Sequence, residues 1–438
     1  MEIETPAWGI EPVPERLRVL GFFDTAALWG SLGVSLLVLV AGTYLVPALS
    51  LRDALIAIVI GGVIGNGMLG TAGAIGAQAR VPGMVLMRPS LGHHGSYLAT
   101  VLNVAQNLGW AIFELIVIAT AAAALSDRAF GFGGKWLWTI VFGVLTAAMA
   151  LAGPIAVVRR FVRRFALWVV LASLLYLTWW TIDHADVGAY WSQPGEGESL
   201  WYGIDLMIAL PASWLPLIAD YTRFSRDRRS AFAGSAIGYL IPNAWLYALG
   251  ALLVLTSSAY HDPTELMTSI AAGGLAAGLA LLALTVDETD EAFANVYSTA
   301  VSLQNILPGV SQRLLIGLAA TGATLGALTI TWAEYETFLF LLGSFFIPLF
   351  GVLLADWLVA GGRYSRADVF QAPSFRPLQI VAWLAGFALY QWLHPLGPSW
   401  WTDLLANVGP ANIGASLPSF AVSFGLAALA ASRYRRQR

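Results

Sequence analysis

The chain of 438 residues is 58% hydrophobic and only 11% charged, and its mean hydropathy is +0.70. A soluble domain carries about 25% charged residues, so this composition excludes a chain that faces water over most of its surface. The net charge of −3 does not indicate a nucleic-acid partner, and the absence of cysteine excludes disulfides, thiolate metal sites and cysteine nucleophiles. The acidic and polar first residues are not expected to form a cleavable signal peptide.

Twelve stretches are mostly apolar over the roughly 20 residues that a membrane-spanning helix needs, and they predict an all-α membrane protein. In chain order the predicted helices lie near 26–47, 53–78, 96–124, 136–157, 164–182, 201–219, 231–255, 269–303, 313–331, 334–359, 376–395 and 412–432. Segments 1–25 and 433–438 remain at the two ends. No predicted loop is long enough for a separate soluble domain.

The basic residues are distributed very unevenly over the predicted loops. Of the 23 lysines and arginines, 20 fall in one alternating set of loops, and the other set holds only Arg52, Arg128 and Lys135. The positive-inside rule then predicts a multi-pass protein of the cell (inner) membrane with both termini in the cytoplasm. An error of one span would scramble this segregation, so the count of twelve helices gains support.

Predicted helices 1 and 6 each contain an interruption. Helix 1 has Ala41 and Gly42 near its centre, and helix 6 has Pro211 and Pro216, which break the hydrogen-bond ladder. Corresponding breaks in two halves of a transporter are typical of an inverted repeat with a binding site at the membrane midplane. The alternative is a pair of ordinary kinks, which are common in membrane helices. The two repeats and the final helix pair are predicted at 26–182, 201–359 and 376–432.

Helix 3 carries three side chains that suit the binding of a flat heterocycle. Gln106, Trp110 and Glu114 are spaced i, i+4 and i+8, so they share one face of the helix. Stacking of a base on an aromatic ring contributes roughly 1–3 kcal/mol, and a carboxylate one turn away accepts hydrogen bonds. The alternative is that Glu114 pairs with another helix and that Trp110 only packs.

Helix 8 holds the densest charge of the chain, in the run TVDETDEAFAN. A solvated loop is the usual meaning of such a run, but here it would leave about a dozen residues for the rest of the span, too few to cross. We therefore expect the carboxylates inside helix 8, facing a wet cavity. Hydroxyl and carboxylate oxygens are ligands that sodium prefers, and the run is equally compatible with proton coupling.

Motifs of enzymes and pumps are missing from the sequence. The five histidines form no HExxH pair, and no Walker, dinucleotide or G-x-S-x-G motif opens a helix. Neither catalysis, a bound cofactor nor ATP-driven pumping is therefore predicted. A channel would need a continuous polar pore, whereas the polar residues concentrate on parts of helices 3 and 8.

Several of these segments resemble the nucleobase–cation symport family. The resemblance is carried by GGVIGNGMLGTAGAIGAQAR of helix 2, QNLGW of helix 3, ADYTRF at the end of helix 6 and ANVYSTAVS of helix 8. SWLPLIADYTRF and the acidic helix 8 look most similar to the hydroxymethylpyrimidine (thiamin-precursor) transporter branch. The resemblance implies a five-plus-five inverted repeat, two additional helices, and a substrate site between helices 1, 3, 6 and 8.

The resemblance also assigns roles to single residues. By position, it implies that Trp110 stacks on the substrate and that Glu114 and Asn295 hydrogen-bond to it; Gln106 lies on the same face. The implied cation site, which sodium would fit, consists of Ala41, Gly42, Thr289 and Asp290. Two positions depart from the family pattern. Pro211 stands where the family has an aromatic residue, so Trp214 one turn later is its expected replacement, and Asp290 puts a charge in place of a hydroxyl.

These observations predict secondary active uptake of a small aminopyrimidine or nucleobase-like heterocycle, such as hydroxymethylpyrimidine or cytosine. The inward gradient of sodium or protons would drive it, since each charge moved inward gains about 2.3 kcal/mol per 100 mV. The alternative is an amino-acid permease of the same architecture. Glu114 would repel the carboxylate of such a substrate.

Overall fold

The computed structural model describes residues 9–153, 167–256, 263–330, 335–406 and 413–436. Apart from one isolated bridge between Leu20 and Ser225, the regular structure of these residues is helical. In chain order the helices are η1 Glu15–Leu17, α1 Phe22–Ser31, α2 Leu36–Thr43, α3 Leu51–Ala79, α4 Gly83–Leu86, α5 Arg88–Leu91, α6 Gly95–Phe130, α7 Lys135–Ala152, α9 Leu167–His184, α10 Val187–Trp191, α11 Leu200–Ser213, α12 Ala219–Thr222, α13 Arg228–Leu253, α14 Pro263–Ala272, α15 Leu275–Asp287, α16 Thr289–Leu303, α17 Gln312–Thr329, α18 Tyr335–Val359, α19 Arg366–Phe370, α20 Pro377–Leu393, α21 Ser399–Ala406 and α22 Ser416–Arg436.

Local sequence signals set the ends of the long helices. Ser50 caps α3 by accepting a hydrogen bond from the Asp53 N–H at 3.1 Å, and Asp227 caps α13 in the same way from Ser230 at 2.8 Å. At its C-terminal end, α6 stops at Gly131, whose φ of 70° lies in the left-handed region that glycine adopts without strain. These caps determine where α3 and α13 begin and where α6 ends.

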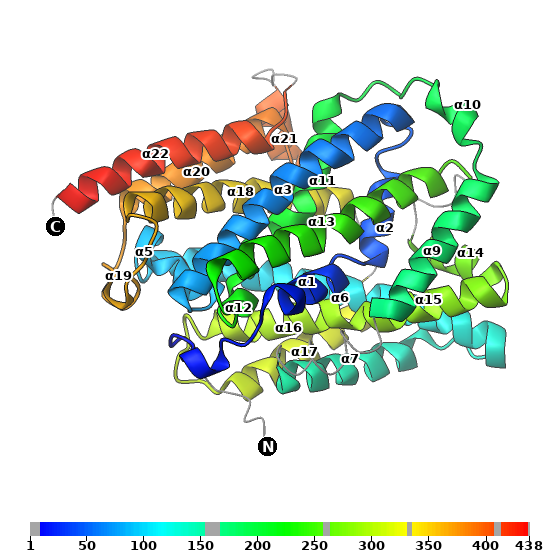
Figure 1. Ribbon diagram of the computed structural model, residues 1–438, viewed down its shortest axis with the longest axis horizontal. Coiled ribbons are helices and arrows are strands. Elements are labelled where there is room, and N and C mark those ends of the chain that lie inside the picture. Colours follow the sequence, from blue (N-terminus) through cyan, green and yellow to red (C-terminus); the bar gives the residue numbers. More distant parts are fainter. Residues whose placement is uncertain (1–8, 154–166, 257–262, 331–334, 407–412, 437–438) are drawn as a thin grey trace.

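The helices pack side by side in three groups (Figure 1). One group places α3 and α1 against α13, and a second packs α16 against α6, α7 and α17. In the third, α18 and α20 pack against α22 near the end of the chain. Helix α11 joins the first group to the third through its contacts with α3 and α18. The residues of the predicted site thus come from helices in neighbouring groups.

Small residues permit the closest of these approaches. A Cβ atom at Gly42 of α2 would collide with the backbone of Tyr247 in α13, and one at Gly250 would collide with the carbonyl oxygen of Leu39. Because glycine has no side chain, the two helix backbones lie almost in contact here. Gly42 therefore serves the packing of α2 against α13.

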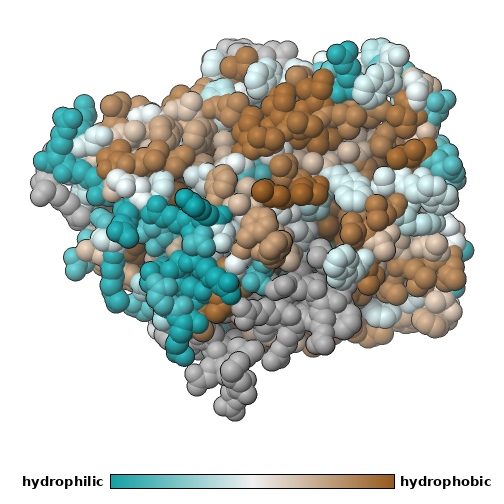
Figure 2. Space-filling model, in the orientation of Figure 1, coloured by the Kyte–Doolittle hydropathy of each residue, from teal (hydrophilic) through white to brown (hydrophobic). Residues whose placement is uncertain are grey.

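Five described helices are long and apolar enough to cross a membrane, namely α3, α6, α7, α13 and α18, and the bent pair α1–α2 makes a sixth. Each of the twelve predicted ranges contains helix, although parts of 136–157, 164–182, 313–331, 334–359 and 412–432 extend outside the described residues. Hydrophobic residues cover much of the upper and right-hand parts of the face shown in Figure 2, and hydrophilic residues gather at its left end and lower left. Five long apolar helices and this surface are what a multi-pass membrane protein requires.

The structure corrects the predicted position of the break in helix 1. The chain bends by 61° between Ser31 and Leu36, whereas the predicted centre of the interruption, Ala41–Gly42, lies inside α2. The carbonyl oxygens of Ala41 and Gly42 accept hydrogen bonds from the backbone N–H groups of Tyr44 and Leu45. They are therefore occupied by the end of the helix.

Helices 6 and 8 also differ in detail from the prediction. The predicted helix 201–219 stops at Ser213, and a series of turns leads to α12 at Ala219. The predicted helix 269–303 is divided into α14, α15 and α16, because Gly274 adopts a φ of 101° and Glu288 lies in a turn between the last two helices. The acidic run therefore sits at a joint between two helices.

Candidate functional site

The break in helix 1 is held open by a carboxylate from the joint in helix 8. Glu288 accepts a hydrogen bond from the Ser35 hydroxyl at 2.7 Å and another from the Leu36 N–H at 2.8 Å. Leu36 is the first residue of α2, so a negative charge lies at the positive end of that helix. Beside it the Ser31 hydroxyl donates to Asp287 at 3.1 Å. Both sides of the break are thus fastened to the acidic joint.

Three backbone carbonyls at the break lack the partners that a continuous helix would supply. The N–H groups of Leu36 and Leu37 donate to the side chains of Glu288 and Ser35 instead of to carbonyl oxygens one turn earlier. Within the described residues, no hydrogen bond is made to the carbonyl oxygens of Leu32, Gly33 or Val34. A buried oxygen without a partner is costly, so these three are candidate ligands for a cation or a water.

The acidic joint is buried rather than solvated, which excludes the loop interpretation of this run. Asp287, Glu288, Asp290 and Glu291 are each at most 5% exposed. Both carboxylate oxygens of Asp290, together with one oxygen each of Asp287 and Glu291, have no hydrogen-bond partner within the described part of the chain, and neither does the Thr289 hydroxyl. Unsatisfied oxygens therefore concentrate in the joint to which Ser31, Ser35 and Leu36 of helix 1 are hydrogen-bonded.

No basic side chain neutralises this joint among the described residues. The ion pairs of the described residues all lie outside the joint, and the buried pair among them, Asp356–Arg376, belongs to the contact between α18 and α20. The described acidic and histidine side chains do not converge in groups of three around one point, so the joint is not built like a carboxylate metal cage. It suits a single monovalent cation held mainly by carbonyl and hydroxyl oxygens, or a shared proton.

Glu114 and Asn295 are brought together by the packing of α6 against α16. The Asn295 amide donates to both Glu114 carboxylate oxygens, at 2.9 and 3.2 Å, and also to the Glu291 carbonyl at 3.2 Å. The amide oxygen of Asn295 has no partner in the described structure. Glu114 also lies within electrostatic range of Glu288 and Asp290, so the pair adjoins the acidic joint.

Trp110 lies one turn from Glu114 and is 5% exposed. Two rings of α18 lie against it in edge-to-face arrangements, with centroid distances of 5.8 Å for Tyr335 and 5.1 Å for Phe338. These near-perpendicular contacts fix the plane of the indole, while its N–H has no partner within the described residues. An aromatic plate with a free donor therefore stands beside a carboxylate–amide pair.

Gln106 connects this face of α6 to the break between α11 and α12, which lies in the sixth predicted helix, 201–219. Its amide N–H group donates to the carbonyl oxygen of Ser213, where α11 ends, at 2.9 Å, and to Asn103 at 2.8 Å. The Gln106 amide oxygen has no partner in the described part of the chain, nor does either amide atom of Asn107. Together with Trp110, three side chains of α6 thus keep a buried polar atom that nothing in the described chain satisfies.

Trp214 directly follows the last residue of α11, at the break between α11 and α12, and it belongs to a different aromatic cluster. Its indole N–H donates to the Tyr239 hydroxyl at 2.9 Å, and its ring meets Trp29 edge-on at 5.5 Å. The polar end of Trp214 is therefore already occupied, unlike that of Trp110. This difference distinguishes the two predicted stacking residues.

Sequence reasoning missed several residues of this arrangement. Ser35 is a recognisable helix cap before the apolar run of α2, and that signal would have located the break of helix 1. The contribution of Phe338 depends on how α18 packs against α6, which no local pattern reveals. Asn103 and Asn107 carry a weaker signal, because amides within a span are costly and each is a candidate for function.

Comparisons with known proteins agree with this geometry. Residues 12–409 match the family described as permease for cytosine/purines, uracil, thiamine, allantoin. A hydantoin permease of Microbacterium maritypicum is 23% identical over 81% of this chain and 76% of its own, and an allantoin permease of Bacillus subtilis is 25% identical over 82% and 79%. A cytosine permease of Escherichia coli K12 is 24% identical over 88% and 89%.

Among solved structures, this chain is similar in fold to Mhp1, a nucleobase-cation-symport-1 family transporter, in a closed conformation with bromovinylhydantoin bound. The TM-score is 0.81 at 19% identity, and the alignment covers 100% of this chain and 96% of Mhp1. The inward-facing conformation of Mhp1 gives 0.74. These relatives are permeases and transporters rather than enzymes. The chain belongs to the family of membrane permeases for cytosine/purines, uracil, thiamine and allantoin, the nucleobase–cation symporters.

Proposed function

We propose that this permease imports a small aminopyrimidine or related nucleobase-like heterocycle, such as hydroxymethylpyrimidine or cytosine, together with sodium or protons. The observation that carries the proposal is the Glu114–Asn295 pair beside Trp110, joined to a buried acidic joint without a basic partner among the described residues. The substrates for which the relatives are named, hydantoin, allantoin and cytosine, are small molecules rich in N–H groups, which supports this class.

The balance of donors and acceptors supports an amino-substituted ring. Acceptors without a partner among the described residues predominate around the site, namely the amide oxygens of Gln106 and Asn295 and one carboxylate oxygen of Glu291. The Glu114 carboxylate, which accepts from Asn295, adds further acceptor capacity. The Trp110 N–H is a donor that a ring nitrogen can accept. A substrate with an exocyclic amino group would satisfy these acceptors, whereas carbonyl oxygens would face them and leave both sides unpaired.

We assign the coupling cation to the space between the helix 1 break and the helix 8 joint. Thr289 and Asp290 keep the role that the sequence predicted, while the freed carbonyls of Leu32, Gly33 and Val34 replace Ala41 and Gly42 as ligands from helix 1. An unpaired carboxylate is strongly disfavoured in a low-dielectric interior, so a bound cation or a proton is needed at Asp290. Both are consistent with this oxygen set.

Binding of radiolabelled cytosine and hydroxymethylpyrimidine to the purified chain tests the proposal. If sodium is the coupling ion, it tightens substrate binding, and substrate tightens sodium binding by the same factor. If a proton is the coupling ion, substrate binding strengthens as the pH falls and does not depend on the sodium concentration. Asp290→Asn is expected to remove the ion dependence while binding at saturating cation persists; Asp53→Asn, an exposed carboxylate on α3, is the matched control.

Two results would refute the assignments separately. Failure of every heterocycle in a thermal-shift panel would reject the substrate class. Full ion dependence in Asp290→Asn would reject the cation site at Asp290 and transfer the role to Asp287 or Glu291, whose oxygens lie in the same joint.

A further inference from the structure

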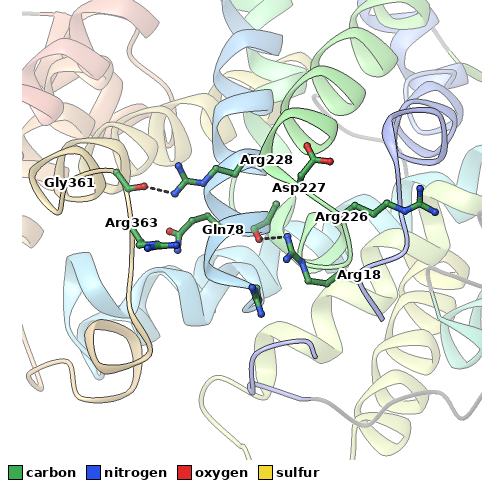
Figure 3. A pocket seen from close by; sticks show the side chains of 10 residues that line it. Arg18, Gln78, Arg226, Asp227, Arg228, Gly361 and Arg363 are labelled. Carbon is green, nitrogen blue, oxygen red and sulfur yellow. Dashed lines mark hydrogen bonds between the residues drawn. The ribbon is translucent and has the colours of Figure 1, made fainter. Parts of the chain in front are cut away.

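A cavity of about 560 Å³ opens at the end of the bundle where α3 ends and α13 begins, and no residue of the acidic joint lines it. Five arginines from four separate segments line it: Arg18, Arg80, Arg226, Arg228 and Arg363. Figure 3 shows the side chains of Arg18, Arg228 and Arg363 gathered around Gln78, with Arg226 directed to the other side. The arginine distribution predicts that this end faces the cytoplasm.

We propose that this cavity binds a phosphate-bearing anion. Its ligand carries the charge and geometry of a phosphate monoester, diphosphate or phospholipid headgroup, because arginine presents a planar fork of donors that matches phosphate oxygens. The volume falls within the range of small-molecule sites, roughly 300–1,000 Å³. The site is distinct from the substrate and cation sites proposed above.

The charge balance of the cavity favours an anion. Its lining carries five arginines and a single carboxylate, Asp227. Among the described residues, the other acidic group paired with the lining is Glu15, which contacts Arg18 at 3.0 Å and Arg80 at 2.5 Å. Five positive and two negative charges leave an excess of three. Such a concentration of like charge attracts an anion toward the space among the guanidinium groups.

Hydrogen bonding shows which guanidinium groups remain available. Arg18 donates to the Ser225 carbonyl at 3.0 Å, and Arg228 donates to the Gly362 carbonyl at 2.6 Å, so these two are held in place by backbone. Within the described residues, Arg363 and Arg226 have neither an ion pair nor a hydrogen-bond acceptor, and both are exposed. Two fixed arginines and one free one, Arg363, therefore surround Gln78 in Figure 3.

Arginine-rich loops are expected at the cytoplasmic end of any such permease. Convergence is what sets these five apart. They come from the segment before α1, the end of α3, the start of α13 and the loop after α18; all five line one cavity, and the side chains of Arg18, Arg228 and Arg363 gather at one point of it (Figure 3). Arg313 at the start of α17 is also exposed but does not line the cavity, so it serves as the control residue.

The test uses the full chain and separates the two sources of phosphate. In the first arm, inorganic pyrophosphate is titrated by calorimetry into protein in a neutral maltoside detergent. In the second, native mass spectrometry counts phosphatidylglycerol retained from nanodiscs of mixed phosphatidylglycerol and phosphatidylcholine. Arg363→Gln is expected to weaken binding at least tenfold in one of the two arms, and Arg313→Gln to leave it unchanged. Pyrophosphate binding should weaken as salt rises.

The outcomes are decisive in either direction. Pyrophosphate binding that Arg363→Gln removes identifies a soluble phosphate compound as the ligand. Loss of phosphatidylglycerol alone identifies a lipid headgroup. No binding in either arm, or equal loss in Arg363→Gln and Arg313→Gln, overturns the proposal. Arg80→Gln, whose backbone lies in the α3 cap, provides a second variant if Arg363→Gln expresses poorly.

Discussion

Glu114 is the residue on which substrate selectivity is expected to depend most directly. Its two carboxylate oxygens accept from the Asn295 amide at 2.9 and 3.2 Å, and it stands one turn from Trp110. Glu114→Gln keeps the size and shape of the side chain but removes the charge and replaces one acceptor by a donor. The change therefore tests the electrostatics of the site and leaves packing almost untouched.

The magnitude follows from the difference between charged and neutral hydrogen bonds. A hydrogen bond to a charged group contributes about 1.5–3 kcal/mol and a neutral one about 0.5–1.5 kcal/mol, so an amino group bound by the neutral amide of Glu114→Gln loses about 1–1.5 kcal/mol. A loss of about 1.4 kcal/mol corresponds to roughly tenfold weaker binding. Uracil, whose carbonyl would face the carboxylate, gains a donor in the variant, so discrimination between cytosine and uracil narrows by at least about tenfold.

Equilibrium binding of cytosine and uracil to purified protein measures both quantities. Asp205→Asn is the matched control, because Asp205 is also a buried carboxylate but accepts from the backbone N–H groups of Ala415 and Ser416 at the start of α22. It should lower the melting temperature without altering the cytosine-to-uracil ratio. If Glu114→Gln leaves affinity and selectivity as in the wild type, Glu114 is a structural partner of Asn295 and the selectivity argument is wrong.

Three further predictions address stacking, topology and packing. Trp110→Ala should abolish measurable binding and Trp110→Phe retain part of it, while Trp214→Ala should be milder; a larger loss at Trp214 in the same binding assay would reverse their roles. Both termini are predicted in the cytoplasm, so an impermeant thiol reagent on intact cells should label Glu196→Cys and not Arg226→Cys; the opposite pattern would invert the orientation. Gly42→Ala should destabilise the fold by about 1–3 kcal/mol, since its Cβ meets the backbone of α13; an unchanged melting temperature would contradict this close packing.

Each of the twelve predicted ranges contains helix, because hydrophobicity over about 20 residues is a strong and local signal, whereas the divisions within helices 1, 6 and 8 depend on tertiary contacts. The sequence assigned Glu114 and Asn295 to substrate binding, which stays a prediction; the structure joins the two by hydrogen bonds, and this is the contact with another helix that the alternative interpretation of Glu114 expects. The position of the helix 1 break was wrong by about two turns. The run around Ala41–Gly42 suggests a weak point, yet those small residues serve the contact with α13, which is invisible without the partner helix.

Glycine and serine at Gly33 and Ser35 were the correct signals, but they are decisive only in combination with helix 8. A serine cap costs little to place anywhere in a membrane helix, because it can bond back to its own turn. Here the Ser35 hydroxyl is bonded to Glu288, 253 residues later in the chain. Tertiary contact of that kind determines whether the helix breaks, and a local pattern cannot express it.

The acidic joint also assigns different tasks to neighbouring carboxylates. Glu288 is occupied by the N-terminus of α2 and one oxygen of Asp287 by Ser31, so each is held by helix 1. Asp290 retains two unpartnered oxygens, among the described residues, in the same joint. A charge at Glu288 would thus stabilise the break that frees the carbonyls of Leu32 to Val34, and in the proposed cation site a charge at Asp290 would attract the ion. If this proposed site is occupied as inferred, an ion held there and the broken form of helix 1 stabilise each other, because an ion that binds only the broken form shifts the equilibrium toward it.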